Sequence, residues 1–193
     1  MSAQRHIKLS PIDAPPRFNA VTKVAISDET IIVRKAKVIA NMAQANIDYL
    51  LVYADKEHGG NFEYLTGFIP RFEEAALVLH ASGEVFLLLG NENLKLSQYA
   101  RVSNTAIHVP YFSLPNQPME NSKTLAELLA DTGVQQAKKI GIVGWKLFTS
   151  KLDDNSQLFD IPHFIFDAIK QSASPVATII NATSLFIGSD IAA

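Results

Sequence analysis

The chain has 193 residues, 17 of them basic and 19 acidic, giving a formal net charge of −2, and it contains no cysteine. Apolar residues make up 48% and charged residues 19%, a composition typical of one globular domain with a sizeable core. The absence of cysteine excludes disulfides, thiolate metal ligands and a thiol nucleophile. The balanced charge lacks a long basic run, so we expect no nucleic-acid partner and no anionic membrane partner.

Two further patterns concern the location of the protein and its first residues. No apolar run approaches the roughly 18 residues of a membrane-spanning helix, and the N-terminus lacks the apolar core of a secretory signal, so we expect a cytoplasmic protein. Residues 1–17 are polar at the start and contain three prolines. We interpret residues 1–17 as an extended N-terminal arm and residues 18–193 as a single domain.

The domain begins with a predicted helix and strand. Apolar residues recur at steps of three and four over residues 28–45, which predicts an amphipathic helix with Ser27 or Asp28 as its N-cap. Asn46 suits the left-handed conformation that often ends a helix. Residues 49–54 form a short apolar run, which predicts a buried strand.

The middle of the chain favours extended structure. Two apolar runs, residues 74–80 and 84–90, flank the short glycine-containing segment 81–83, and this pattern predicts a β-hairpin. Residues 107–111 form a further predicted strand, followed by a loop rich in proline and asparagine.

Helices and strands alternate in the last third. Thr124 and Glu127 have the spacing of a capping box that opens a helix over residues 124–131, with Gly133 as its expected C-cap. Residues 138–145 then predict another buried strand.

The last predicted elements are a helix over residues 161–169, with Asp160 as its N-cap, and a strand over residues 176–182. A hairpin followed by alternating helices and strands indicates the α/β class, with a mixed β-sheet flanked by helices on both faces. Four phenylalanines near this end of the chain are expected to pack in the core or, alternatively, to form a subunit contact. They are Phe159, Phe164, Phe166 and Phe186.

The segment from Lys56 to Leu79 combines charged, aromatic and glycine residues in one loop region, where binding residues commonly gather. In one interpretation Arg71 pairs with one of the nearby glutamates and orders the loop; in the other, the loop faces a substrate or a subunit. We predict no metal site and no catalytic residue in this chain, because the adjacent residues Glu57 and His58 lack a metal-binding spacing. The predicted substrate- or interface-facing residues are Glu57, His58, Asn61, Tyr64, Phe68, Arg71, Glu73 and Glu74.

Several short motifs resemble one known family. The run Tyr64-Leu-Thr-Gly-Phe68, followed by a strand and a hairpin, is similar to the signature of the creatinase N-terminal domain, and the resemblance spans residues 18–187. It implies a creatinase N-terminal domain-like fold with a ribonuclease H-like topology. The other matching landmarks are Glu57-His58, Asn61, Arg71-Phe-Glu-Glu74, Gly144-Trp145-Lys146 and Asn181-Ala182-Thr183.

The resemblance to the creatinase, prolidase and aminopeptidase P superfamily also implies a division of labour. In that superfamily a C-terminal pita-bread domain holds the catalytic site, with two divalent metals, manganese or cobalt, bound by carboxylates and a histidine. We expect that domain and its ligands to be absent from this chain. The full-length parent is then a metal-dependent Xaa-Pro aminopeptidase- or dipeptidase-like hydrolase.

Three functions follow as alternatives. The first is an accessory, non-catalytic N-terminal domain that shapes substrate access and oligomer contacts, most simply as a homodimer. The second is a stand-alone module that binds a small carboxylate through Arg71. The third is a stand-alone hydrolase that uses Glu57 and His58.

Overall fold

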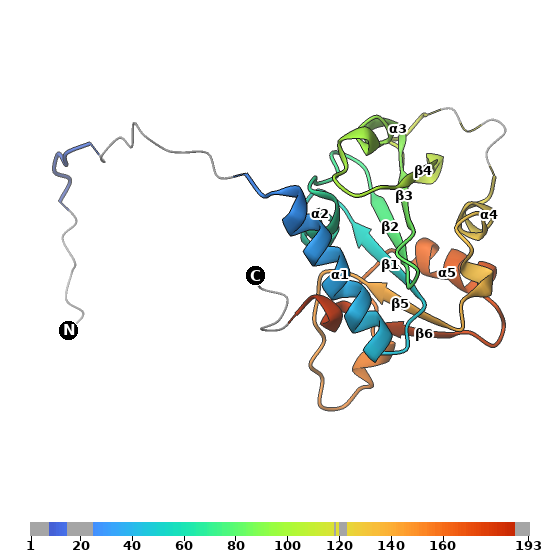
Figure 1. Cartoon of the computed structure of the whole chain (residues 1–193). Helices are drawn as coiled ribbons and strands as arrows, with labels where there is room; N and C mark the ends of the chain where they lie inside the picture. Colours follow the sequence, from blue (N-terminus) through green and yellow to red (C-terminus); the bar gives the residue numbers. More distant parts are fainter. Residues whose placement is uncertain (1–7, 15–24, 118, 120–122, 188–193) are drawn as a thin grey trace, which may run out of the picture.

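The computed structural model describes residues 8–14, 25–117, 119 and 123–187. Its centre is one six-stranded mixed sheet with the strand order β4-β3-β2-β1-β5-β6 (Figure 1). β1–β2 and β2–β3 are antiparallel pairs, whereas β1–β5, β5–β6 and β3–β4 are parallel. The mixed sheet and the ribonuclease H-like order of its central strands are therefore as expected. The strands are β1 (Tyr49–Ala54), β2 (Ala75–His80), β3 (Val85–Leu89), β4 (Thr105–His108), β5 (Lys139–Val143) and β6 (Thr178–Asn181).

Helices cover both faces of the sheet (Figure 1). The sheet face formed by Leu50 and Val52 packs in one core with α1 and α2, whereas Tyr49 and Leu51 point into a second core with α4 and α5. All four of these β1 side chains are fully buried. Alternate side chains of a strand point to opposite faces, so an unbroken apolar run is what a strand covered on both sides requires. The helices are α1 (Asp28–Gln44), α2 (Gly60–Thr66), α3 (Asn91–Leu94), α4 (Leu125–Ala130) and α5 (His163–Ser172).

The local signals for helix ends are confirmed where they involve neighbouring residues. The Ser27 hydroxyl accepts the backbone N–H of Thr30 at 3.2 Å and caps α1, and Asn46 takes the left-handed conformation with φ 54°. Thr124 and Glu127 form the complete capping box at the start of α4. Each of these bonds joins residues three apart, which is why sequence spacing alone could predict them.

Other boundaries differ from the prediction. β4 begins two residues earlier than expected, at Thr105, and it ends earlier because Pro110 opens a 3₁₀ turn, Pro110–Phe112. Gly133 does have a positive φ of 83°, but α4 is capped at Asp131 and Gly133 precedes a further 3₁₀ turn. α2 and α3 were not predicted, because helices this short carry too little periodicity to recognise.

Three of the four late phenylalanines pack inside the domain. Phe159 and Phe166 lie 4.7 Å apart, between ring centroids, against the α4–α5 core, and Phe186 meets the ring of Tyr64 edge-on at 6.0 Å. Phe164 is 42% exposed. Core packing is thus confirmed for these three partly buried rings, and Phe164 is the most exposed of the four.

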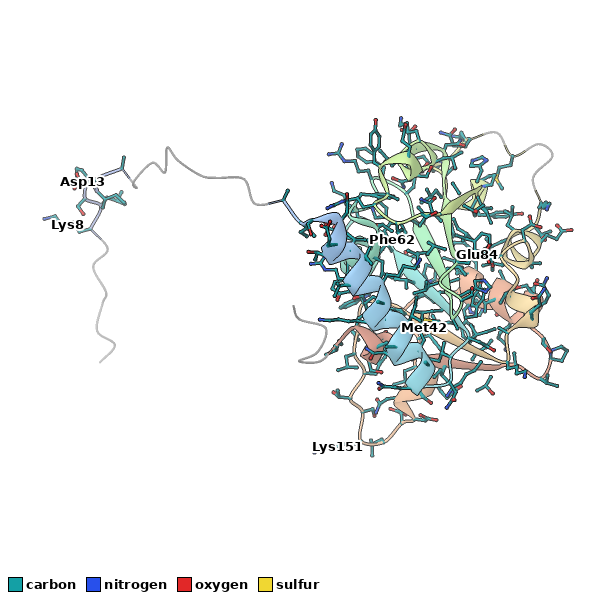
Figure 2. The ribbon with its side chains drawn as sticks, viewed as in Figure 1. Lys8, Asp13, Met42, Phe62, Glu84 and Lys151 are labelled. Carbon is teal, nitrogen blue, oxygen red and sulfur yellow. The ribbon has the colours of Figure 1, made fainter. Side chains whose placement is uncertain are left out.

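The predicted N-terminal arm is described over residues 8–14. These residues are exposed and form no helix or strand, and Figure 2 shows Lys8 and Asp13 away from the sheet. Residues 1–7 and 15–17 of the arm lie outside the described residues.

Candidate functional site

Most of the predicted site residues lie at one end of the sheet. Ala54 of β1 stands opposite Ala75 of β2, so the chain between them leaves and re-enters the sheet at the same end. β5 runs parallel to β1, and β6 to β5, so the carboxyl ends of these three strands lie there too. Ligand sites of open α/β sheets form outside the carboxyl ends of parallel strands. We call residues 55–61, 69–74 and 144–148 the carboxyl rim.

Asp55 and His58 form a polar pair on the rim. The Asp55 Oδ1 atom accepts the backbone N–H groups of Glu57 at 2.8 Å and His58 at 2.7 Å, and the His58 Nδ1 atom lies 3.0 Å from both carboxylate oxygens. Burial acts to raise the pKa of Asp55, but the hydrogen bonds from His58 and Glu57 outweigh it and lower that pKa. A carboxylate can only accept, so Nδ1 carries the proton and Nε2 is left for a contact outside the pair.

The loss of folding stability at low pH tests the pair of Asp55 and His58. The pKa of Asp55 lies below its unfolded value of about 3.9, so the stabilisation is present above that value and is lost as pH falls through the folded pKa. In urea unfolding measured at successive pH values, we expect Asp55→Asn to reduce the fall of the free energy of unfolding at low pH. Asp13→Asn in the exposed arm should leave that fall unchanged. Identical profiles for wild type and Asp55→Asn would refute the assignment.

Trp145 holds the other side of the His58 ring. The two rings are stacked with centroids 4.5 Å apart at 23°, and the Lys146 ammonium lies 5.0 Å from the Trp145 ring centroid. The backbone N–H groups of Trp145 and Lys146 both donate to Asp160 Oδ2 at 2.7 Å. Trp145 is nevertheless 48% exposed, so the loop presents an aromatic ring and a cation on a fixed backbone.

Asp160 was predicted to cap α5, and this prediction is wrong. α5 begins after Pro162 without a side-chain cap, while the Asp160 carboxylate turns to the rim loop. The helix begins two residues further along the chain than an Asp160 cap would require, and Asp160 Oδ2 accepts both N–H groups of the rim loop instead. Gly144 must be a glycine here, because a Cβ at that position would overlap the Asp160 carboxylate.

Asn61 links the two rim loops. Its Nδ2 atom donates to the Gly144 carbonyl at 2.8 Å, and the Gly144 N–H donates to Thr183 Oγ1 at 3.3 Å. The Thr183 N–H in turn donates to Asn181 Oδ1 at 2.9 Å. Landmarks more than 80 residues apart along the chain therefore meet at the rim. Asn61 acts here as a positioning residue, since its amide is used inside the fold.

Tyr64 and Phe68 lie away from the rim, in the α1–α2 layer. The Arg34 guanidinium sits 4.5 Å from the centroid of the Tyr64 ring, and Phe68 meets the buried ring of Phe62 edge-on at 5.3 Å. Their role in the matched signature is to pack α2 against its neighbours.

Glu73 was predicted to face a substrate or a subunit, but it is buried inside the fold and only 4% exposed. Its carboxylate accepts the backbone N–H groups of Glu92 at 2.9 Å, Asn93 at 3.3 Å and Leu114 at 3.3 Å. Gly90 leaves the space that this carboxylate fills, because a Cβ there would contact it. Glu73 therefore joins the segment before β2 to the loops that follow β3 and β4.

The predicted ion pair of Arg71 is wrong. Arg71 is exposed, and within the described ranges its guanidinium has no ion pair with Glu57, Glu73 or Glu74. Its loop is ordered instead by the backbone, since the Arg71 N–H donates to Asn93 Oδ1 at 2.9 Å. The guanidinium thus remains available to a group outside the domain.

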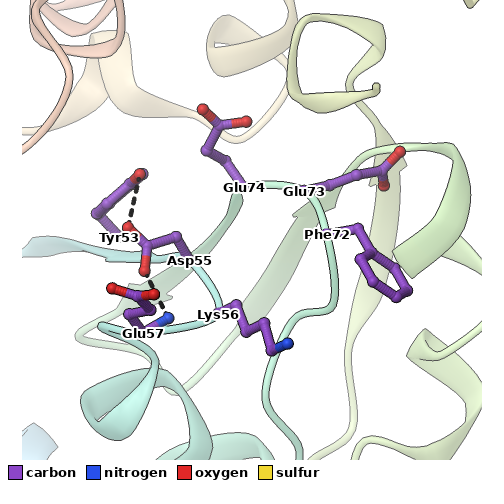
Figure 3. Close-up of a pocket in the computed structure, with 7 residues that line it drawn as sticks. All are labelled: Tyr53, Asp55, Lys56, Glu57, Phe72, Glu73 and Glu74. Carbon is purple, nitrogen blue, oxygen red and sulfur yellow. Dashed lines mark hydrogen bonds between the residues drawn. The ribbon is translucent and has the colours of Figure 1, made fainter. Parts of the chain in front are cut away.

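A surface pocket of about 380 Å³ lies on the rim between the end of β1 and the start of β2 (Figure 3). Glu57 is exposed and Glu74 is half-buried. The pocket is lined by Tyr53, Asp55, Lys56, Glu57, Phe72, Glu73 and Glu74.

The described residues contain neither a metal-binding cluster nor a membrane-spanning helix. Among residues 8–14, 25–117, 119 and 123–187, no group of three or more histidine, aspartate or glutamate side chains is arranged to hold a metal ion. Over the same residues, no helix has the length and apolar character needed to cross a bilayer.

The predicted site residues did not include Asp55, Lys56 or Phe72, and the sequence assigned Asp160 to another role. Asp55 had one usable signal, an acidic residue directly after a buried strand and within reach of the next turn's backbone N–H groups. The stacking of His58 on Trp145 had none, because 87 residues separate the two positions, 58 and 145.

Solved structures of peptidases share this fold. An Xaa-Pro aminopeptidase structure from Streptococcus pyogenes aligns with a TM-score of 0.54 and 15% identity, over 82% of this chain and 96% of that one. The N-terminal domain of the cytoplasmic peptidase PepQ from Mycobacterium tuberculosis aligns with a TM-score of 0.52 and 15% identity, over 79% and 95%. Dipeptidase PepE from Mycobacterium ulcerans aligns at 0.52 and 15% identity, over 83% of this chain but 36% of its own.

The chain thus spans about a third of the length of some of these relatives, including the Xaa-Pro dipeptidase from Bacillus anthracis, of which it covers 34%. No curated protein matches the sequence. The family model for the creatinase/prolidase N-terminal domain matches residues 34–186, well over half of the chain and including every landmark on the rim. This chain therefore belongs to the creatinase/prolidase N-terminal domain family.

Proposed function

We propose that this chain is the accessory, non-catalytic N-terminal domain of an Xaa-Pro peptidase-like metallohydrolase, and that its carboxyl rim borders the catalytic site of a C-terminal partner domain. The observation that supports this proposal is the construction of the rim. His58 and Trp145 are held by Asp55 and Asp160 through hydrogen bonds, yet both rings reach the surface. Fixed side chains on a rigid sheet can orient a substrate and limit the size of what enters.

The chemistry of bond cleavage belongs, in this proposal, to the partner domain. Two divalent metals there, manganese or cobalt, would activate the water that attacks the peptide. The residues of this chain would bind and orient the substrate and exclude larger molecules. Arg71 and Lys146 offer cations to a substrate carboxylate, and Trp145 offers an apolar face. We further propose a cytoplasmic location.

Hydrolysis assays test the accessory role. With manganese, cobalt or zinc, the 193-residue chain alone is expected to show no turnover of Xaa-Pro dipeptides, because its rim supplies positioning groups without a metal-bound nucleophile. The full-length parent is expected to turn them over, and removal of residues 1–193 from that parent should broaden its selectivity towards longer peptides. Metal-dependent turnover by the isolated chain that survives further purification would overturn the proposal in favour of a hydrolase built on Glu57 and His58.

We also propose that the domain forms a homodimer. The rim exposes apolar surface at Ile69, Trp145 and Leu147, which are between 38% and 48% exposed. A specific dimer needs about 800 Å² buried per partner, and twofold pairs dominate homo-oligomers. Light scattering over a concentration series is expected to give the dimer mass, and Trp145→Ser and Leu147→Ser should lower it. A monomer mass at the highest concentration would refute the dimer.

A small-carboxylate-binding module is the second candidate. The observation in its favour is that Arg71 is exposed and, among the described residues, forms no ion pair with Glu57, Glu73 or Glu74, the three glutamates considered as its partners. Titration of the chain with acetate and succinate, followed at the Arg71 side chain by NMR, distinguishes this candidate, since an accessory domain without its partner should show no saturation.

A further inference from the structure

The pocket between the end of β1 and the start of β2 has a distribution of charge that the accessory role does not use. Its two walls come from different segments, residues 53–57 and residues 72–74, and Figure 3 shows Lys56 extending from the first wall toward Phe72 on the second. Glu73 offers no accessible carboxylate oxygen to a ligand, because it is buried and its carboxylate is bound by three backbone N–H groups, whereas the Asp55 side chain is partly exposed. The remaining groups separate into a negative part, a positive part and an apolar wall.

The negative part surrounds the hydroxyl of Tyr53. That hydroxyl donates to Asp55 Oδ2 at 3.4 Å. Burial raises the pKa of Tyr53, and the charges of Asp55 and then Glu74 raise it further, so both carboxylates act on the same point of the pocket. Tyr53 therefore stays a neutral donor, and the two carboxylates form a site of negative potential that an ammonium group would neutralise.

The positive part is Lys56. Within the described ranges its ammonium has no carboxylate within ion-pair distance, and it lies 5.9 Å from the centroid of the Phe72 ring. The pocket thus holds charges of both signs, with Lys56 and Glu74 apart from each other although both line it. A ligand with both signs of charge would bridge that separation.

The apolar wall is the ring of Phe72, which is 68% exposed. Its backbone has a φ of 64°, a conformation uncommon for a bulky residue. The residues on either side hold it there: the Arg71 N–H donates to Asn93, and the Glu73 carboxylate is buried. The fold therefore presents this ring at the pocket mouth and does not allow it to collapse into the core.

We propose that this pocket binds a zwitterionic α-amino acid with an apolar side chain. Asp55, Glu74 and the Tyr53 hydroxyl would surround the ammonium group, Lys56 would pair with the carboxylate, and the side chain would lie against Phe72. A simple cation would meet Lys56, and a simple anion would meet the carboxylates of Asp55 and Glu74 with the exposed Glu57 beside them, so neither satisfies the pocket. The inference is independent of the accessory role, because every group it uses belongs to this chain.

NMR titration of the 193-residue chain with L-leucine tests the proposal. We expect saturable shifts at Lys56, Phe72 and Glu74, with a dissociation constant on the order of millimolar, as suits a small open pocket. N-acetyl-L-leucine lacks the ammonium and L-leucinamide lacks the carboxylate, and each should bind at least about tenfold more weakly. Absence of saturation, or equal binding of all three compounds, would overturn it.

Variants of two pocket residues, each with a matched control outside the pocket, test where L-leucine binds. Lys56→Met and Glu74→Gln should each weaken L-leucine binding about tenfold, whereas the exposed residues Lys138 and Glu84 lie outside the pocket, so Lys138→Met and Glu84→Gln should not. Both pocket side chains have solvent-exposed surface and should not be required for folding, which the dispersion of the NMR spectrum checks. Undiminished binding by Lys56→Met and Glu74→Gln together would place the ligand elsewhere and reject the site.

Discussion

Replacing Glu73 with alanine is expected to lower the free energy of unfolding by about 3 kcal/mol, a large part of the stability of a domain this size. The buried carboxylate accepts three backbone N–H groups, from Glu92, Asn93 and Leu114. The substitution would leave those three donors without the partner that the fold provides for them. Urea unfolding followed by circular dichroism gives the free energy directly.

The neighbouring Glu74 provides the control. It is half-buried, and Glu74→Ala should change the free energy of unfolding by no more than about 0.5 kcal/mol. Glu73→Gln should fall between the two, since its amide oxygen still accepts while its NH₂ group cannot. Equal stability of Glu73→Ala and Glu74→Ala would show that the Glu73 hydrogen bonds do not hold these loops together.

Replacing Gly144 with alanine is expected to cost about 3 kcal/mol and to disturb the rim. The new Cβ would overlap the Asp160 carboxylate, which must then release the N–H groups of Trp145 and Lys146. The chain has one tryptophan, so its fluorescence reports directly on this loop. We expect a red-shifted emission as Trp145 leaves the His58 ring, together with a lower midpoint of urea unfolding.

Gly60 is the matched control for this substitution. It begins α2, and a Cβ at that position would meet no atom within 4 Å. Gly60→Ala should leave Trp145 emission unchanged and raise the free energy of unfolding by roughly 0.5–1 kcal/mol, because alanine loses less backbone entropy in a helix than glycine does. Unchanged emission and unchanged stability in Gly144→Ala would show that the rim loop has more room than the structure indicates.

The sequence by itself determined the elements whose stabilising contacts are local or periodic. The apolar run of β1 gave the strand Tyr49–Ala54 with its predicted bounds, because a strand buried on both faces needs apolar residues at every position. The caps of α1 and α4 followed from hydrogen bonds between residues three apart. The landmark motifs also indicated the family correctly.

The hydrogen-bond partners of the polar rim residues could be known only from the tertiary structure. Asp160 could have capped α5, and Glu73 could have paired with Arg71. Instead Asp160 accepts two backbone N–H groups and Glu73 accepts three, all from segments distant in the sequence. A buried carboxylate is stabilised by whatever donors the fold brings to it, and that depends on how strands far apart in sequence are placed side by side. The stacking of His58 on Trp145 has the same origin, in the parallel pairing of β1 with β5.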